Sequence, residues 1–341
     1  MINPDMHNSV WSKLTRVRRA ASKTFTGGLT AAFVLVLNLA IAAPAQTPAQ
    51  TPATGGAPAQ ATQAQSSRVQ TIPFASKLVG KSLPYMVLLP KDYDAPSSKA
   101  MRYPVLYLLH GLGGQPSNWF APRMNLVNAA QDYPVILVAL TDDGHWYTDS
   151  ANVATDKYET YIFDELIPDV QKRFRTVESR EGRGVAGLSM GGYGALKLGV
   201  KHSEMFAFAG SMSGALSIAA AGETELGGVP FILASVMKTF GPLDSPTRRA
   251  NDLFKLVREL PAARISALPY LYLDCGTEDM FQLTPVNRQM TDLLIERKIP
   301  HEYRELPGDH NMAYWGRQSP ELLRVAMATL KSPSMSPSIS H

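Results

Sequence analysis

Short, continuously apolar runs separated by polar or glycine-rich loops mark the middle of the chain. The runs at residues 105–109 (VLYLL) and 135–140 (VILVAL) contain no polar alternation. Such runs are typical of strands that are buried on both faces of a parallel sheet. Residues 184–188, 270–273 and 301–306 are further strand candidates. We therefore expect a central sheet of mainly parallel strands.

Helical spacing of apolar residues appears between these runs. Residues 156–174 carry apolar side chains at positions 158, 161, 162, 166 and 170, which predicts a helix. Pro168 lies inside this segment and predicts a kink or an early end. Residues 191–202, 286–297 and 312–330 are also expected to be helical. The alternation predicts an α/β fold in which helices flank the sheet.

One segment, residues 214–250, is too long for a simple connection between a strand and a helix. We expect it to form a small cap insertion. Its predicted apolar side consists of Phe231, Ile232, Val236 and Met237.

The two ends of the chain differ from the middle in composition. An apolar run of 14 residues at 30–43 follows a basic stretch and precedes Ala43-Pro44-Ala45, which is typical of a secretory signal peptide. A membrane span needs about 20 residues. We therefore expect residues 1–45 to be cleaved, leaving no stable membrane anchor and a secreted or periplasmic protein. Residues 46–67, rich in Pro, Ala, Thr and Gln, predict a disordered linker, and 333–341 a flexible tail. One α/β domain remains at 68–332.

Charge and cysteine content exclude several classes of function. The formal net charge of +4 comes from residues 1–45, because residues 46–341 hold 28 cations and 28 anions. A neutral domain lacks the basic surface that binds a phosphate backbone, so we expect no nucleic-acid partner. Cys275 is the only cysteine, which excludes an intramolecular disulfide and a cysteine-based zinc site. Without an HExxH motif or paired histidines on a helix, we expect no metal.

The sequence Gly187-Leu-Ser189-Met-Gly191 places a G-x-S-x-G motif between a predicted strand and a predicted helix. This context is typical of a nucleophile elbow, in which a sharp turn lifts the serine into a cleft. The loop HGLGG at residues 110–114 supplies a second glycine-rich turn. Backbone amides aimed at the developing oxyanion stabilise acyl transfer, which nominates the amides of Leu112 and Met190. We expect His110 to support this loop rather than to act as the base.

The general base of such an enzyme is a histidine that follows the nucleophile and the acid in the chain. His202, His301, His310 and His341 follow Ser189, and only His310 lies in a turn between the last predicted strand and the last helix. For the acid we favour Asp279, with Glu278 as its rival. Asp274 falls within or at the end of a strand, and Cys275 is interpreted as an inert buried thiol.

Three tryptophans of the domain each lie just beyond a segment that should border the site: Trp119, Trp146 and Trp315. Aromatic side chains commonly line ligand pockets, so the three are candidate substrate-binding residues. The alternative is that they pack loops onto the core.

Six segments in order resemble a known family: LLHGLGG at 108–114, GHWYTDS at 144–150, YETYIFDELIPDV at 158–170, GLSMGGYGAL at 187–196, CGTEDMF at 275–281 and GDHNMAYW at 308–315. They are similar to the esterase D-like "putative esterase" branch of the α/β-hydrolases, which includes tributyrin-type esterases, feruloyl esterases, S-formylglutathione hydrolases and mycolyltransferases. The resemblance implies an α/β-hydrolase fold, Ser189, Asp279 and His310 as the triad, Leu112 and Met190 as the oxyanion hole, and no cofactor.

These features favour an exported serine carboxylesterase that forms an acyl-enzyme on Ser189. Short-acyl or feruloyl-type esters are the expected substrates, either small molecules or esters linked to carbohydrate. The resemblance leaves an acyltransferase of the mycolyltransferase type as an alternative. A hydrolase fold can also be used as a non-catalytic binding module. The oligomeric state is not indicated by the sequence.

Overall fold

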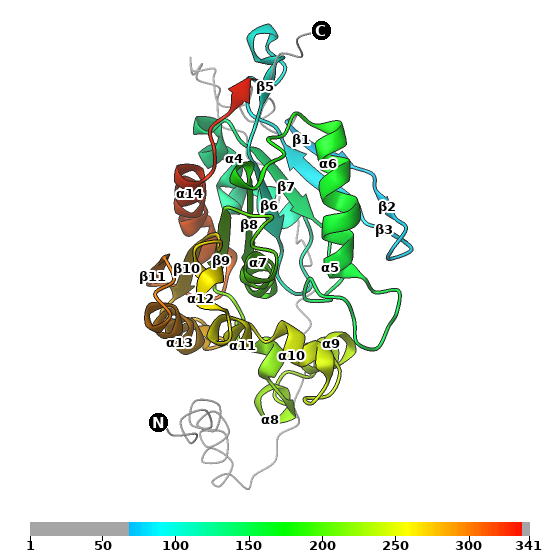
Figure 1. Ribbon diagram of the computed structural model, residues 1–341, viewed down its shortest axis with the longest axis vertical. Coiled ribbons are helices and arrows are strands. Elements are labelled where there is room, and N and C mark those ends of the chain that lie inside the picture. Colours follow the sequence, from blue (N-terminus) through cyan, green and yellow to red (C-terminus); the bar gives the residue numbers. More distant parts are fainter. Residues whose placement is uncertain (1–67, 336–341) are drawn as a thin grey trace, which may run out of the picture. The chain divides into compact units, whose positions relative to one another are not determined.

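A computed structural model describes residues 68–335, and the predicted signal peptide and linker lie outside them. Eight strands form one sheet in the order β1-β4-β7-β6-β8-β9-β10-β11 (Figure 1). Their bounds are β1 Val69–Ile72, β4 Tyr85–Leu88, β6 Val105–Leu109, β7 Ile136–Leu140, β8 Arg183–Leu188, β9 Phe208–Met212, β10 Tyr270–Gly276 and β11 His301–Leu306. The six neighbouring strands β7, β6, β8, β9, β10 and β11 pair in parallel. At one edge, β4 pairs antiparallel with β7, and β1 pairs antiparallel with β4.

This arrangement confirms the expected α/β-hydrolase fold with a mainly parallel sheet. All five predicted strands are present. Strands β1, β4 and β9 were not predicted, and β9 reads Phe-Ala-Gly-Ser-Met, a run with no β-branched residue. Its place between β8 and β10 gives it neighbours on both sides, so the tertiary setting rather than local propensity makes it a strand.

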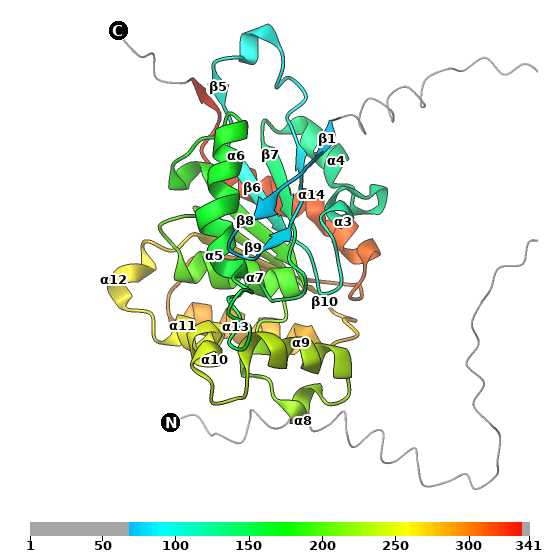
Figure 2. The same cartoon turned by 90° about the vertical axis from the view of Figure 1, so that its right-hand side faces the viewer.

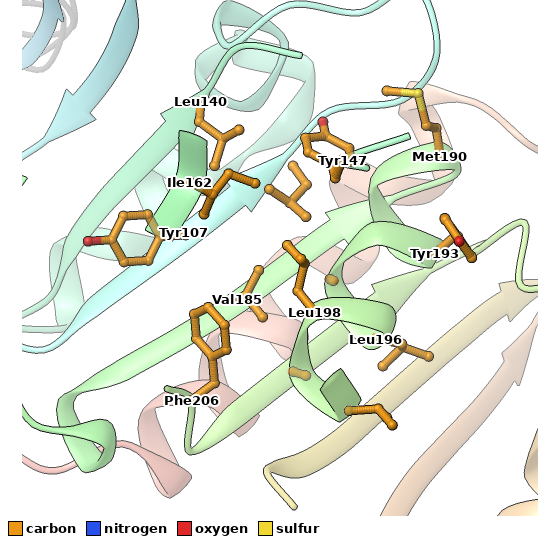
Figure 3. Packing of buried hydrophobic residues seen from close by; sticks show 14 of the residues in the cluster. Tyr107, Leu140, Tyr147, Ile162, Val185, Met190, Tyr193, Leu196, Leu198 and Phe206 are labelled. Carbon is orange, nitrogen blue, oxygen red and sulfur yellow. The ribbon is translucent and has the colours of Figure 1, made fainter. Parts of the chain in front are cut away.

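Alternate residues of the central strands enter two separate cores. In β6, Val105, Tyr107 and Leu109 join one core, whereas Leu106 and Leu108 join the other. The first core contains Tyr193 and Leu198 of α7 (Met190–Lys201) together with Tyr107 and Val185 of the sheet, and Figure 3 shows Leu198 next to Val185. The second contains Leu322 and Leu323 of α14 (Met312–Thr329). The helices therefore cover both faces, and Figure 1 places α14 and α6 on opposite sides of the sheet.

The flanking helices complete these two layers. The longer ones are α13 (Leu283–Glu296) and α11 (Leu253–Arg258), and the shorter ones include α3 (Ser117–Phe120), α4 (Leu126–Ala129) and α12 (Ala262–Ile265). The predicted helices at 191–202, 286–297 and 312–330 correspond to α7, α13 and α14, each within three residues at its ends.

The helix predicted over residues 156–174 is present but contains a wider turn. It consists of α5 (Tyr158–Tyr161), a π-helical segment (Ile162–Leu166) and α6 (Ile167–Arg173). The expected early end at Pro168 is wrong. Pro168 is the second residue of α6, directly after the π-helical segment, where a missing N–H is tolerated at the start of a helical turn.

The predicted cap insertion is present as four short helical segments at residues 214–250. They are a 3₁₀ turn (Ile218–Ala220), α8 (Glu223–Leu226), α9 (Pro230–Phe240) and α10 (Pro246–Asn251), and Figure 2 shows α8, α9 and α10 grouped together at one end of the sheet. Val236 is fully buried, as predicted. Phe231 on the same helix is 62% exposed rather than buried.

The chain continues as ordered structure beyond the predicted domain end. Ser334 and Met335 form β12, which pairs antiparallel with Met101 and Arg102 of β5. The predicted tail boundary at 333 is therefore too early, since backbone pairing with β5 fixes these two residues. Among residues 68–335, no helix is both long enough and apolar enough to span a membrane.

Candidate active site

Ser189 stands at the sharp turn between β8 and α7, as the motif predicts. Its backbone has φ 57° and ψ −117°, a conformation that is rare for a residue with a side chain. The turn is held by the Ser189 N–H, which donates to the Met212 carbonyl at 2.9 Å, and by the Ser189 carbonyl, which accepts from the Tyr193 and Ala215 amides. The surrounding hydrogen bonds therefore maintain the strained conformation.

The two glycines of the motif are required by close backbone approach. A Cβ on Gly187 would lie 2.1 Å from the Gly191 carbonyl oxygen, and one on Gly191 would lie 2.1 Å from the Leu109 carbonyl oxygen. Both distances are far inside van der Waals contact. The spacing G-x-S-x-G thus packs the turn against β6 and leaves Ser189 half-exposed at the carboxyl end of the sheet.

Ser189, His310 and Asp279 form one hydrogen-bonded chain. His310 Nε2 lies 2.9 Å from Ser189 Oγ, and His310 Nδ1 lies 2.8 Å from Asp279 Oδ2. The structure brings these three residues together from positions 31 and 121 residues apart in the sequence. The Asp279 side chain is fully buried and that of His310 is 6% exposed. Within this low-dielectric setting the geometry suits transfer of a proton from the serine to the imidazole.

The two candidate acids differ in where their side chains lie, because the Asp279 carboxylate contacts His310 and the Glu278 side chain is exposed. The Asp279 carboxylate also accepts a hydrogen bond from the Phe281 amide at 3.0 Å, so its second oxygen is satisfied. Glu278 is exposed, and its backbone amide donates to the Gly308 carbonyl instead. Asp279 therefore occupies the position that the sequence left open between the two.

Two aromatic rings pack against His310. The Phe281 ring lies 4.8 Å from it and the Trp315 ring 4.9 Å, both nearly perpendicular to the imidazole. The Trp315 Nε1–H in turn donates to Ser213 Oγ at 3.3 Å. These edge contacts restrict rotation of His310, and the role of Phe281 was not indicated by any sequence motif.

The two amides nominated for the oxyanion hole flank Ser189. A Cβ on Gly111 would lie 3.3 Å from Ser189 Cβ, so the HGLGG loop packs directly against the nucleophile. Met190 is the first residue of α7, where helix amides have no partner within the helix. Among residues 68–335, neither the Leu112 nor the Met190 amide donates a hydrogen bond to the protein. Both donors are therefore available to a ligand.

A cleft of about 810 Å³ begins at Leu112 and extends toward the cap. Its charged residues already have partners within the protein. The buried Asp142 carboxylate accepts hydrogen bonds from the His145 and Tyr147 amides. The Asp143 carboxylate pairs with Lys81 at 3.1 Å, and Lys238 pairs with Asp156 at 3.4 Å. The remaining lining is apolar or neutral and polar: Thr71, Ser82, Pro84, Met86, Leu112, Gly113, Gly114, Gln115, Pro116, Ser117, Thr141, Gly144, Phe231 and Ser235. The cleft thus favours an uncharged ligand.

The three tryptophans do not line this cleft, so their assignment as substrate-binding residues is corrected. Trp119 is fully buried in the core on the α14 side of the sheet. Trp146 is 2% exposed, and its Nε1–H donates to Ser235 Oγ of the cap at 3.1 Å. Trp315 supports His310 as described above. The physical reason is that each ring gains more by burying its large apolar area than by facing solvent. Phe231, which the sequence placed on the apolar side of the cap, lines the cleft together with Ser235 of α9, and no motif in the sequence indicated Ser235.

Cys275 is buried, as expected of an inert thiol. Its Sγ lies 3.8 Å from Asp279 Oδ2 and 3.6 Å from Thr284 Oγ1, and burial raises its pKa to about 12. The thiol is therefore protonated at neutral pH. Among residues 68–335, no group of three or more His, Cys, Asp or Glu side chains is placed to hold a metal ion.

With the geometry in place, comparison with known proteins gives a family. The family model described as "Putative esterase" matches residues 76–324. The chain belongs to this family. An esterase of Mycobacterium tuberculosis is 32% identical over 254 residues, which cover 70% of this chain and 54% of that protein. The chain therefore spans about half the length of this relative.

Two further relatives of this esterase-family protein are covered over nearly their full length. The acetyl esterase of Caldicellulosiruptor saccharolyticus is 27% identical over 265 residues, covering 73% of this chain and 94% of that protein. The solved structure of a ferulic acid esterase aligns with a TM-score of 0.63 and 26% identity, covering 77% of this chain and 98% of that one. Both of these relatives are named as esterases.

Proposed function

We propose that the protein is a serine carboxylesterase that forms an acyl-enzyme on Ser189. The observation that carries this proposal is the hydrogen-bonded chain from Asp279 through His310 to Ser189, with two unpaired amides beside it. A non-catalytic binding module would not need a strained serine, an oriented imidazole and free amide donors in one place.

The reaction follows from this geometry. As Ser189 Oγ attacks the ester carbonyl, its proton passes to His310 Nε2, and the new negative charge on the carbonyl oxygen is stabilised by the Leu112 and Met190 amides. His310 then gives its proton to the departing alcohol oxygen, and the acyl group remains on Ser189. Water repeats the sequence and releases the acid. Asp279 stabilises the imidazolium through the Nδ1–H bond.

For the substrate we propose a short-acyl or feruloyl-type ester, with an uncharged and hydroxyl-rich alcohol such as a carbohydrate. The hydroxyl and amide groups of the cleft offer hydrogen bonds to such an alcohol, and the exposed Phe231 ring offers an apolar face. The names of the two relatives, acetyl esterase and ferulic acid esterase, support this range.

Activity on p-nitrophenyl esters of increasing acyl length, measured beside methyl ferulate, tests both parts. Ser189→Ala should lower kcat by several orders of magnitude, because the triad acts as a unit, and should abolish labelling by a fluorophosphonate probe. Wild-type protein that neither hydrolyses esters nor takes up the probe would favour the binding module.

Phe231→Ala tests the cleft separately. It should raise KM for methyl ferulate more than KM for p-nitrophenyl acetate. Leu243→Ala is the matched control, since Leu243 is an equally exposed apolar residue of the cap that does not line the cleft. Equal effects of the two variants would argue against an aromatic subsite at Phe231.

We further propose export, on the basis of the basic and apolar composition of residues 1–45. Mass spectrometry of the protein recovered from the producing cells should find a mature chain that begins near Gln46. An uncleaved N-terminus on a membrane-bound form would contradict this.

A further inference from the structure

His110 is a buried polar side chain at the end of β6 that the mechanism above does not use. Its Nδ1 lies 2.8 Å from the Gly111 carbonyl oxygen, and its Nε2 lies 3.1 Å from the Asp142 amide nitrogen. A carbonyl can only accept and an amide N–H can only donate. The two contacts therefore require a neutral ring that carries its proton on Nδ1. Burial lowers the pKa of His110, which favours the same neutral form.

The backbone around this ring is held on both sides. The Asp142 carboxylate accepts the amides of His145 and Tyr147 at 2.6 and 2.5 Å. The Tyr147 hydroxyl donates to the His110 carbonyl at 2.8 Å. These hydrogen bonds form a closed set. They fix the direction in which His110 Nε2 accepts from the Asp142 amide and Nδ1–H donates to the Gly111 carbonyl.

The Gly111 carbonyl belongs to the same peptide unit as the Leu112 N–H. Because a trans peptide is planar, its C=O and N–H point in opposite directions. The oxygen receives two hydrogen bonds, one from His110 Nδ1 and one from the Gly114 amide at 2.9 Å. Holding the oxygen on one side therefore directs the Leu112 N–H to the other, and Leu112 lines the cleft.

We infer that His110 is a positioning residue for the oxyanion hole: its Nδ1–H holds the Gly111 carbonyl so that the Leu112 amide faces the oxygen of a bound ester. This inference rests on the proposed esterase function. It also gives a reason for histidine at this position, because the loop needs a donor and an acceptor on one rigid ring.

Two substitutions separate the contacts. In His110→Asn the amide nitrogen can occupy the position of Nδ1 and keep the bond to Gly111, whereas the acceptor for Asp142 is lost. In His110→Gln the longer side chain can place its oxygen near the position of Nε2 and keep the bond from Asp142, whereas the donor to Gly111 is lost. Each variant thus retains one contact.

Loss of one oxyanion-hole donor lowers kcat by about 10²–10³-fold, so we expect misdirection of Leu112 in His110→Gln to lower kcat/KM by about 10- to 100-fold, mostly through kcat. The affinity for a trifluoromethyl ketone, whose adduct carries an oxyanion, should fall in parallel. His110→Asn should retain more activity than His110→Gln even where its melting temperature is lower. Activity that follows melting temperature instead, or wild-type kcat/KM and inhibitor affinity in His110→Gln, would overturn the inference.

A measurement on the wild-type protein covers the case in which neither variant folds. The ¹⁵N shifts of the His110 ring, assigned through its backbone resonances, should show a protonated Nδ1 and an unprotonated Nε2 at neutral pH. The opposite tautomer or an imidazolium would refute the positioning role. An inactive wild-type protein would instead refute the proposed function, and the ring shifts would still decide the geometry.

Discussion

Asp274 on β10 provides a test of the electrostatics next to the site. Its carboxyl is fully buried and lies beside the hydroxyls of Tyr272 and Tyr314. Burial raises its pKa from 3.8 to about 7, with the two tyrosines and Arg304 acting in the opposite direction. The folded protein therefore keeps this proton over a pH range in which the unfolded chain has lost it.

The sign and size of the effect on stability follow from that difference. Between about pH 4 and pH 7 the folded state binds more protons at Asp274 than the unfolded state, so its contribution to stability falls as pH rises. A tenfold change in proton affinity is worth about 1.4 kcal/mol, so a rise from 3.8 to about 7 corresponds to about 4 kcal/mol. Above pH 7 both states are ionised and the loss is complete.

Asp274→Asn removes the titration while keeping the side-chain shape. Measured by urea titration between pH 4 and pH 8, the free energy of unfolding of the variant should become progressively larger than that of the wild type, by up to about 4 kcal/mol at the upper end, because only the wild type loses stability as pH rises. Asp292→Asn is the control, because Asp292 is exposed on α13. A difference between Asp274→Asn and wild type that stays constant across this range would show that the carboxyl does not titrate as the structure implies.

Three further outcomes are expected. Asp279→Asn should lower kcat by about 10⁴-fold through the wrong imidazole tautomer, whereas the exposed Glu278→Gln should keep near wild-type kcat in the same p-nitrophenyl acetate assay; the reverse result would make Glu278 the acid. Gly191→Ala should lower the melting temperature, because the new Cβ would lie 2.1 Å from the Leu109 carbonyl oxygen and overpacking typically costs about 1–3 kcal/mol. Gly228→Ala is the control and should be neutral, because a Cβ there meets no atom within 4 Å. Treatment with EDTA should leave esterase activity unchanged, because the proposed chemistry is performed by Ser189, His310 and Asp279; loss of activity that a divalent ion restores would contradict that mechanism.

Much of this protein is determined by local pattern in the sequence. Strands β6, β7 and β8 are apolar runs that can be buried on both faces, and the spacing of Gly187, Ser189 and Gly191 encodes a turn in which only glycine fits beside the backbone. Because such constraints act between residues close in the chain, they are legible without a structure. The chain order of nucleophile, acid and base likewise pointed to His310.

Contacts between distant segments decided the rest. Asp279 and Glu278 are adjacent in sequence, and only the fold turns one toward His310 and the other toward solvent. The tryptophans offered the same chemistry to a cleft or to a core, and packing placed Trp119 and Trp146 in the core while Phe231 remained exposed. Strand β9 and the role of His110 depend in the same way on neighbours that the chain meets only after folding, because burial and hydrogen-bond direction are properties of the assembled sheet rather than of the local sequence.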